Sequence, residues 1–135
     1  MARSGQTYGI IGTAVLSGKH LSRYVISDHV MRIKPGPHAK MMPGYLMTAL
    51  SHPLFGRPLV KALAYGSSIP EIEVADIASL EVVRLKSRDE ADIANLAEAS
   101  VEARAAADVL EQEIGRDAGA VIERFIQSPT AGVTR

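Results

Sequence analysis

Three consecutive residues, Ser27, Asp28 and His29, are of the types that form a hydrolase triad. Nucleophilic catalysis requires these three side chains to converge on one another. Residues 24–34 alternate imperfectly between apolar and polar types, which favours a β-strand, and adjacent residues of a strand point to opposite faces. We therefore expect a structural role for the three residues and predict no catalytic residue.

A second pattern, Gly12 followed by Gly18 and Lys19, superficially matches a phosphate-binding loop. That motif requires four residues between its glycines and a Ser or Thr after the lysine. Here five residues separate the glycines, and His20 replaces the hydroxyl residue that would hold magnesium. The pattern is therefore not a nucleotide site.

The histidines do not form a metal-binding pattern either. They stand too far apart for a helical pair of ligands, and Asp28 is the only acidic residue among them: His20, His29, His38 and His52. The chain also contains no cysteine, which excludes disulfides, thiolate zinc sites and a cysteine nucleophile. We predict no metal and no cofactor.

The charge of the chain is divided unevenly along its length. Residues 1–68 contain eight Lys and Arg and a single acid, a net charge of +7, whereas residues 69–135 contain seven bases and fourteen acids. A basic half attracts phosphates by releasing their counterions, while an acidic half avoids them. The asymmetry favours a nucleic-acid partner for the first half; a solvated surface of uneven charge is the alternative.

The candidate DNA-contacting side chains lie in predicted turns or at the ends of short predicted helices within the basic half. They are Arg3, Lys19, His20, Lys40, Arg57 and Lys61, together with the hydroxyls of Ser67 and Ser68. Each charged residue has the alternative interpretation of a solvated surface group. For the two serines the alternative is a capped helix end at Gly66 with Tyr65 packed inward.

The elements that must position these residues indicate an α+β fold, a small sheet with short helices. Residues 8–16, 24–34 and 81–85 have the composition of strands, the first interrupted at its glycines. Short helices are predicted at residues 43–51, where Pro43 suits a first turn, at 54–65, closed by Gly66, and at 74–79.

A long coiled-coil-forming helix is predicted to follow, at residues 87–127. Ser87 and Glu90 have the spacing of a capping box, and no proline occurs from there to Pro129. Apolar and small residues recur at three- and four-residue spacing, a seam that needs a partner helix: Ile93, Leu96, Ala103, Ala107, Leu110, Ile114 and Val121. The alternative is a helix that breaks at Gly115 or Gly119 and folds back. We divide the chain into residues 1–86, 87–127 and a flexible tail at 128–135.

Several short motifs occur in an order that resembles a known family. They are Pro43-Gly44-Tyr45-Leu46, Ala64-Tyr65-Gly66-Ser67, Ile69-Pro70-Glu71-Ile72 and Ile77-Ala78-Ser79-Leu80-Glu81-Val82, preceded by Arg3-Ser4-Gly5 and by residues 26–33. Together with the helix after Ser87, this order is similar to the C-terminal part of one target-recognition domain, with its conserved spacer helix, in specificity subunits of Type I restriction-modification systems. The resemblance covers about residues 3–126.

The resemblance implies a cytoplasmic, non-catalytic protein that recognises double-stranded DNA and docks methyltransferase and restriction subunits, which carry the catalysis. It differs from the family pattern in having one recognition domain, which begins partway through. Pairing of two copies through the long helix, or pairing with another specificity chain, would restore two-fold presentation of half-sites. A truncated remnant or an assembly protein that pairs through the helix without binding DNA is the alternative. We expect no membrane association, because no apolar run is long enough to span a bilayer.

Overall fold

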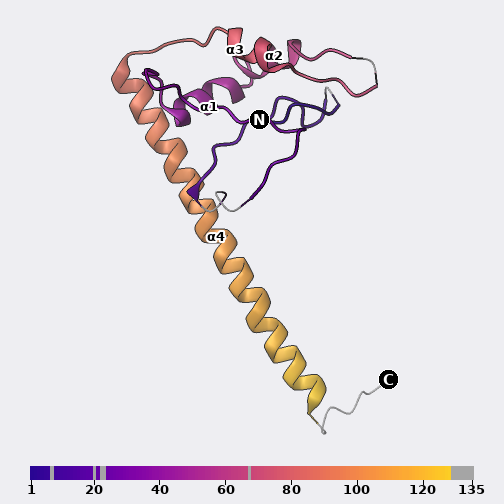
Figure 1. Ribbon diagram of the computed structural model, residues 1–135. Helices are drawn as coiled ribbons and strands as arrows, with labels where there is room; N and C mark the ends of the chain where they lie inside the picture. The colour runs from indigo at the N-terminus through magenta and orange to yellow at the C-terminus, as the bar shows by residue number, and fades with distance from the viewer. Residues whose placement is uncertain (7, 20, 22–23, 67, 129–135) are drawn as a thin grey trace. The chain divides into compact units, whose positions relative to one another are not determined.

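The computed structural model describes residues 1–6, 8–19, 21, 24–66 and 68–128. The chain divides into two compact units, Met1–Val101 and Glu102–Arg135, and the ribbon is drawn in Figure 1. Of the predicted features, His20, Ser67 and nearly all of the tail at 128–135 lie outside the described residues.

Four helices form in the described residues: α1 (Pro43–Ser51), α2 (Arg57–Ala62), α3 (Val74–Ser79) and α4 (Ser87–Gln127) (Figure 1). The predictions for 43–51, 74–79 and 87–127 are confirmed. α1 begins at Pro43 because the fixed φ of proline suits a first turn, where its missing N–H is not needed.

The helix predicted at 54–65 is shorter than expected at both ends. His52 Nδ1 accepts the backbone N–H groups of Leu54 and Phe55, which holds a turn ahead of α2. At the other end, Tyr65 exchanges two backbone hydrogen bonds with Glu71, so the chain has already left the helix. Gly66, with a φ of +110°, therefore belongs to the segment between Tyr65 and Glu71 and is not the cap of α2.

The predicted sheet does not form within the described residues. Among these residues the backbone makes three isolated antiparallel bridges, which join Ala2 with Val30, Ser4 with Glu71 and Tyr65 with Glu71. This part of the chain is mostly helical, with short helices followed by one helix of 41 residues.

Each predicted strand fails for a local reason. Residues 8–12 form turns, because Gly9 N–H donates to Gln6 O and Gly12 has a φ of +68°. Residues 24–34 are interrupted by the turn in which Val30 N–H donates to Ser27 O. Residues 81–85 are non-helical, but their backbone is not bridged to any other segment that the structure describes. A strand composition without a partner segment gives no ladder.

The N-terminal segment 1–5 organises the first unit in place of a sheet. Ala2 exchanges backbone hydrogen bonds with Gly12 and Thr13 at 2.8 and 2.9 Å. Arg3 N–H donates to His29 O at 2.7 Å, and Arg3 O accepts from Ile72 N–H at 2.9 Å. One short segment thus joins three others from distant parts of the sequence.

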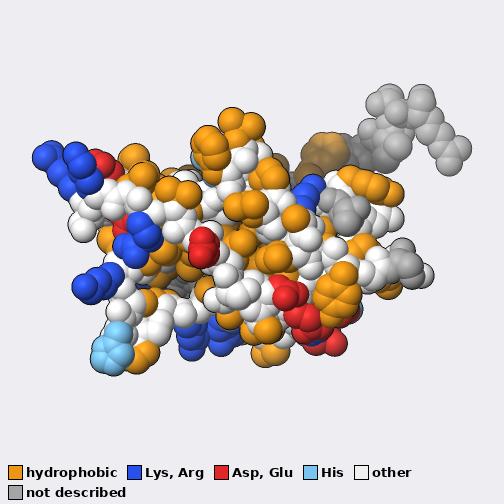
Figure 2. Space-filling view, turned by 90° about the horizontal axis from the view of Figure 1, so that it is seen from above, with side chains coloured by type: hydrophobic (Ala, Val, Ile, Leu, Met, Phe, Trp, Pro, Cys, Tyr) orange, Lys and Arg blue, Asp and Glu red, His pale blue; other side chains and the backbone are white. Residues whose placement is uncertain are grey.

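The hydrophobic core of the first unit is small. It consists of Met1, Ile11, Met31, Leu50, Val60 and Ile72, of which three are fully inaccessible: Ile11, Val60 and Ile72. Gly12 lies against this core, since a Cβ added there would meet the Val60 side chain at 2.6 Å. Many apolar side chains stay at the surface, and Figure 2 shows hydrophobic side chains spread over the face in view.

α1 and the first turns of α4 touch at two small residues. A Cβ added to Gly44 would lie 2.6 Å from the backbone oxygen of Ala94, which is itself inaccessible to solvent. Only a residue without a side chain permits this approach. Beside it, Tyr45 is buried and its hydroxyl donates to Val83 O at 2.7 Å.

α4 is continuous from Ser87 to Gln127, a length of about 60 Å at 1.5 Å per residue. It passes through Gly115 and Gly119 without interruption, so the break considered at these glycines does not occur. In the predicted capping box the carboxylate of Glu90 would pair with Ser87. In the structure this carboxylate instead accepts the N–H of Leu85, two residues before Ser87. Of the helices described, α4 included, not one is both long and apolar enough to cross a membrane.

Candidate nucleic-acid interface

Arg3, the first predicted DNA contact, is used inside the fold. Its Nη2 atom lies 3.4 Å from carboxylate oxygens of both Glu71 and Glu73, and its Nε is buried without a hydrogen-bond partner. Tyr65 donates its hydroxyl to Glu73 at 2.7 Å and completes the cluster. The proximity of the carboxylate, first through this hydrogen bond, raises the pKa of Tyr65. The charge of Arg3 is thus neutralised within the protein.

Arg57 is likewise held by neighbouring chain atoms. Its Nη2 donates to Gly9 O at 3.3 Å and to Thr13 Oγ1 at 3.1 Å, so the first residue of α2 fixes the turn at residues 8–13. Its Nη1 is buried without a hydrogen-bond partner. A guanidinium in this position stabilises the turn, and its approach to a DNA phosphate would require these bonds to break.

The other described candidates are free to meet a ligand. Lys19, Lys40 and Ser68 are exposed, and Lys61 in α2 is half-buried. The three lysines form no ion pair with any residue that the structure describes. The basic candidates therefore separate into two arginines that serve the fold and three lysines that remain available.

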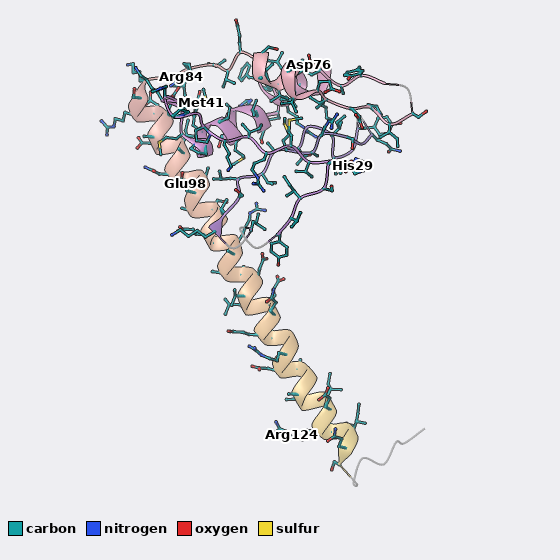
Figure 3. The ribbon with its side chains drawn as sticks, viewed as in Figure 1. His29, Met41, Asp76, Arg84, Glu98 and Arg124 are labelled. Carbon is teal, nitrogen blue, oxygen red and sulfur yellow. The ribbon has the colours of Figure 1, made fainter. Side chains whose placement is uncertain are left out.

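A serine–histidine pair that the sequence did not suggest lies on the N-terminal segment. Ser4, which is 6% exposed, shares a hydrogen bond of 2.7 Å with His29 Nδ1, and His29 Nε2 lies 3.8 Å from Asp28 Oδ1. Figure 3 labels His29 on its loop. The expectation that Asp28 and His29 point apart is wrong, because they occupy a turn and not a strand. Neither Ser4 nor His29 lines the hollows described below.

An apolar groove of about 400 Å³ lies between α1 and the non-helical segment that precedes α4. Tyr45 and Leu50 of α1, Phe55, Val82 and Ile93 line it. Ile93 was predicted to face a partner helix, but it is half-buried and belongs to this groove in the first unit.

Two further hollows flank residues 30–34. The first, of about 480 Å³, is lined by Leu21, Tyr24 and Ile26 together with residues 30–34 and 17–18. The second, of about 530 Å³, is lined by residues 33–36 and by side chains that include Ala39, Met41 and Leu46. Figure 3 labels Met41 close to α1.

The predicted helix-partner residues beyond Ile93 are exposed. Leu110 and Ile114 are 59% and 67% exposed, and the remaining members of the seam are exposed as well: Leu96, Ala103, Ala107 and Val121. Four more apolar residues of α4 are also exposed and extend the apolar surface: Val109, Ile122, Phe125 and Ile126.

No group of three or more metal-ligating side chains occurs among the residues that the structure describes. Comparison with protein families, with curated proteins and with solved structures finds no significant match to this chain.

Proposed function

We propose that this chain is a DNA-recognition module of the kind found in Type I restriction-modification specificity subunits, which binds double-stranded DNA and docks methyltransferase and restriction subunits without catalysis. The observation that carries the proposal is the separation of charge. Residues 29–70 contain no acid, Lys34 and Lys40 there are exposed, Lys61 is half-buried, and none of these lysines forms an ion pair with a residue that the structure describes.

Free surface cations of this kind favour a polyanion over a neutral ligand. Each phosphate that a Lys or Arg neutralises releases condensed counterions, which makes the binding free energy strongly dependent on salt. The acidic second half, with a net charge of −7, is repelled by the same phosphates and leaves the first half to make the contact.

The test measures fluorescence anisotropy of a labelled duplex of about 30 base pairs, titrated with the full chain in 50 and 200 mM salt. With about four phosphates contacted, the association constant falls on the order of a hundredfold between these two salt concentrations. Absence of binding at 50 mM, or an affinity that does not change with salt, would contradict the proposal.

A second candidate function is assembly through α4 without DNA binding. The exposed apolar residues of α4 favour it. Covering a helix surface that includes Leu110, Ile114 and Phe125 with another helix removes apolar area from water, which lowers the free energy of the assembly. The partner helix would come from a second copy of the chain or from another specificity chain.

Two substitutions separate these functions. The variant L110D/I114D places two charges in the seam and should abolish self-association in analytical ultracentrifugation, whereas the DNA affinity of the monomer should fall only modestly. The control A105D/Q112D adds the same charge on the other side of α4 and should associate like the wild type. If the seam variant loses association while wild type fails to bind DNA, only the assembly function stands.

A further inference from the structure

Three exposed cations occur close together in the sequence of the first unit, in a part not fully covered by the predicted DNA contacts. Arg32, Lys34 and Lys40 occur within nine residues, and all three are exposed. They form no ion pair among the described residues, and the nearest acids in sequence are Asp28 and Glu71. No other described part of the first unit has so many free cations in so few residues.

The backbone places two of these side chains on the outer side of the segment. Residues 31–34 are neither turn nor helix, and Met31 is buried in the core. Where side chains alternate along an extended segment, Arg32 and Lys34 lie on one side of it, about 7 Å apart along the chain. Arg32 and Lys34 are both exposed, whereas Met31, next to Arg32, is buried.

The pair lines one hollow, and the third cation follows directly after a residue of the other. Arg32 and Lys34 both line the hollow of about 480 Å³, and Lys34 also lines the hollow of about 530 Å³, whose wall includes Ala39, the residue before Lys40. Met1 and Val15 are shared by both hollows and give them apolar walls. Lys34 therefore lies on both hollows, with Arg32 on the first and Ala39, the neighbour of Lys40, on the second.

Tyr24 adds an aromatic ring to the first hollow. It lines the hollow together with Arg32, and 67% of it is exposed. A cationic rim with an apolar, partly aromatic floor matches the sugar–phosphate backbone, in which anionic phosphates alternate with weakly polar sugars. An acidic peptide with apolar side chains would fit the same surface, so the test includes polyglutamate as a competing ligand.

We propose that the backbone of bound DNA lies along residues 32–40, with Arg32 and Lys34 contacting phosphates at the rim of the hollow that Tyr24 lines and Lys40 contacting a phosphate farther along the segment. This assignment rests on the proposed DNA-binding function. It moves the principal contacts away from Arg3 and Arg57, whose guanidinium groups are already engaged within the fold.

The test uses the full chain and two matched triple variants. R32Q/K34Q/K40Q removes the three proposed contacts, and R104Q/R116Q/R124Q removes three exposed charges from α4, so both change the net charge equally. Duplex affinity is measured by anisotropy over 50–200 mM salt. The first variant should bind on the order of tenfold to a hundredfold more weakly at 100 mM salt, with the slope of log K against log salt less steep by about three. The control variant should keep the wild-type slope.

The outcomes distinguish the site from the function. If the wild type binds duplex and both triple variants bind equally well, or weaken equally, the site assignment is overturned while DNA binding stands. If the wild type does not bind duplex, the function fails and the site with it. Preference for polyglutamate over duplex would assign the segment to an acidic protein partner. The conservative variant K34R/K40R, which keeps the charge, should bind like the wild type, and the circular dichroism spectrum of the first variant should match that of the wild type if the variant is folded.

Discussion

Arg84 and Glu90 form a bidentate ion pair, with Nε to Oε1 and Nη2 to Oε2 both at 2.7 Å. The same Oε1 atom accepts the N–H of Leu85 at 2.9 Å, and Glu90 is only 4% exposed. The pair therefore ties residues 84–85 to the first turn of α4 (Figure 3, in which Arg84 is labelled). Tyr45 fixes the same segment from α1 through Val83.

Acid should weaken this connection. The hydrogen bonds from Arg84 lower the pKa of Glu90 from 4.5 to about 2, helped by Leu85 N–H and opposed by desolvation. A depressed pKa means that the folded state prefers the ionised carboxylate, so the stabilisation is complete above pH 4.5 and is lost as the pH falls toward 2. Urea unfolding followed by circular dichroism measures this. At pH 7 the urea concentration at the unfolding midpoint should be higher for the wild type than for Glu90→Gln, and this difference should shrink between pH 4.5 and 2. A difference that is constant over this range would contradict the assigned role.

Gly44→Ala should destabilise the first unit by about 1–3 kcal/mol through overpacking. The added methyl group would lie 2.6 Å from Ala94 O and 2.9 Å from Ala94 Cα, so α1 and the start of α4 must separate. The free energy of unfolding from urea titration measures this. The control Gly36→Ala has no atom within 4 Å of its new Cβ. Equal stability of the Gly44→Ala protein and the wild type would show that the two helices do not touch in solution.

Gly115→Ala and Gly119→Ala should each stabilise α4 by about 1 kcal/mol, because alanine loses less backbone entropy in a helix and meets nothing within 4 Å at either position. The helical signal at 222 nm during thermal unfolding checks this. If either substitution lowers the helical signal, α4 is not continuous at that residue.

Arg3→Gln should reduce stability by about 1 kcal/mol or less, since its ion pairs with Glu71 and Glu73 are partly exposed. The same variant should keep the wild-type salt dependence of the proposed DNA binding, because the charge of Arg3 is already neutralised within the fold. Urea titration and duplex anisotropy measure the two effects separately. The opposite pattern, unchanged stability with a shallower salt slope, would restore Arg3 as a phosphate contact.

The helices could be predicted because their signals are local. Pro43 sets the start of α1, and the proline-free run after Ser87 sets α4, without reference to any distant residue. The strands could not, because a strand depends on its partner. The glycine at position 12 was the one clear sequence signal against the strand predicted at 8–16. In the structure its φ of +68° converts this apolar run into a turn.

The candidate site was harder to predict for the same reason. Residue type alone does not show that Arg3 is paired within the fold while Lys40 is free. The carboxylates that pair with Arg3 lie 68 and 70 positions away in the sequence. The sequence placed Ile93 in the helix seam by its spacing, whereas α1 and residues 80–85 surround it in the apolar groove. The charge asymmetry, by contrast, was fully visible in the sequence.

The N-terminal segment also has a kinetic consequence. Arg3 bonds to Ile72 and Gly5 to Pro70, so these hydrogen bonds close only after a chain segment of more than sixty residues has folded back on itself. Contacts of such long sequence separation slow folding, whereas the hydrogen bonds of α4 span only a few residues and form in about a microsecond. A chain in refolding should therefore acquire its long helix well before its small core, and stopped-flow circular dichroism should show a fast helical phase followed by a slower burial phase.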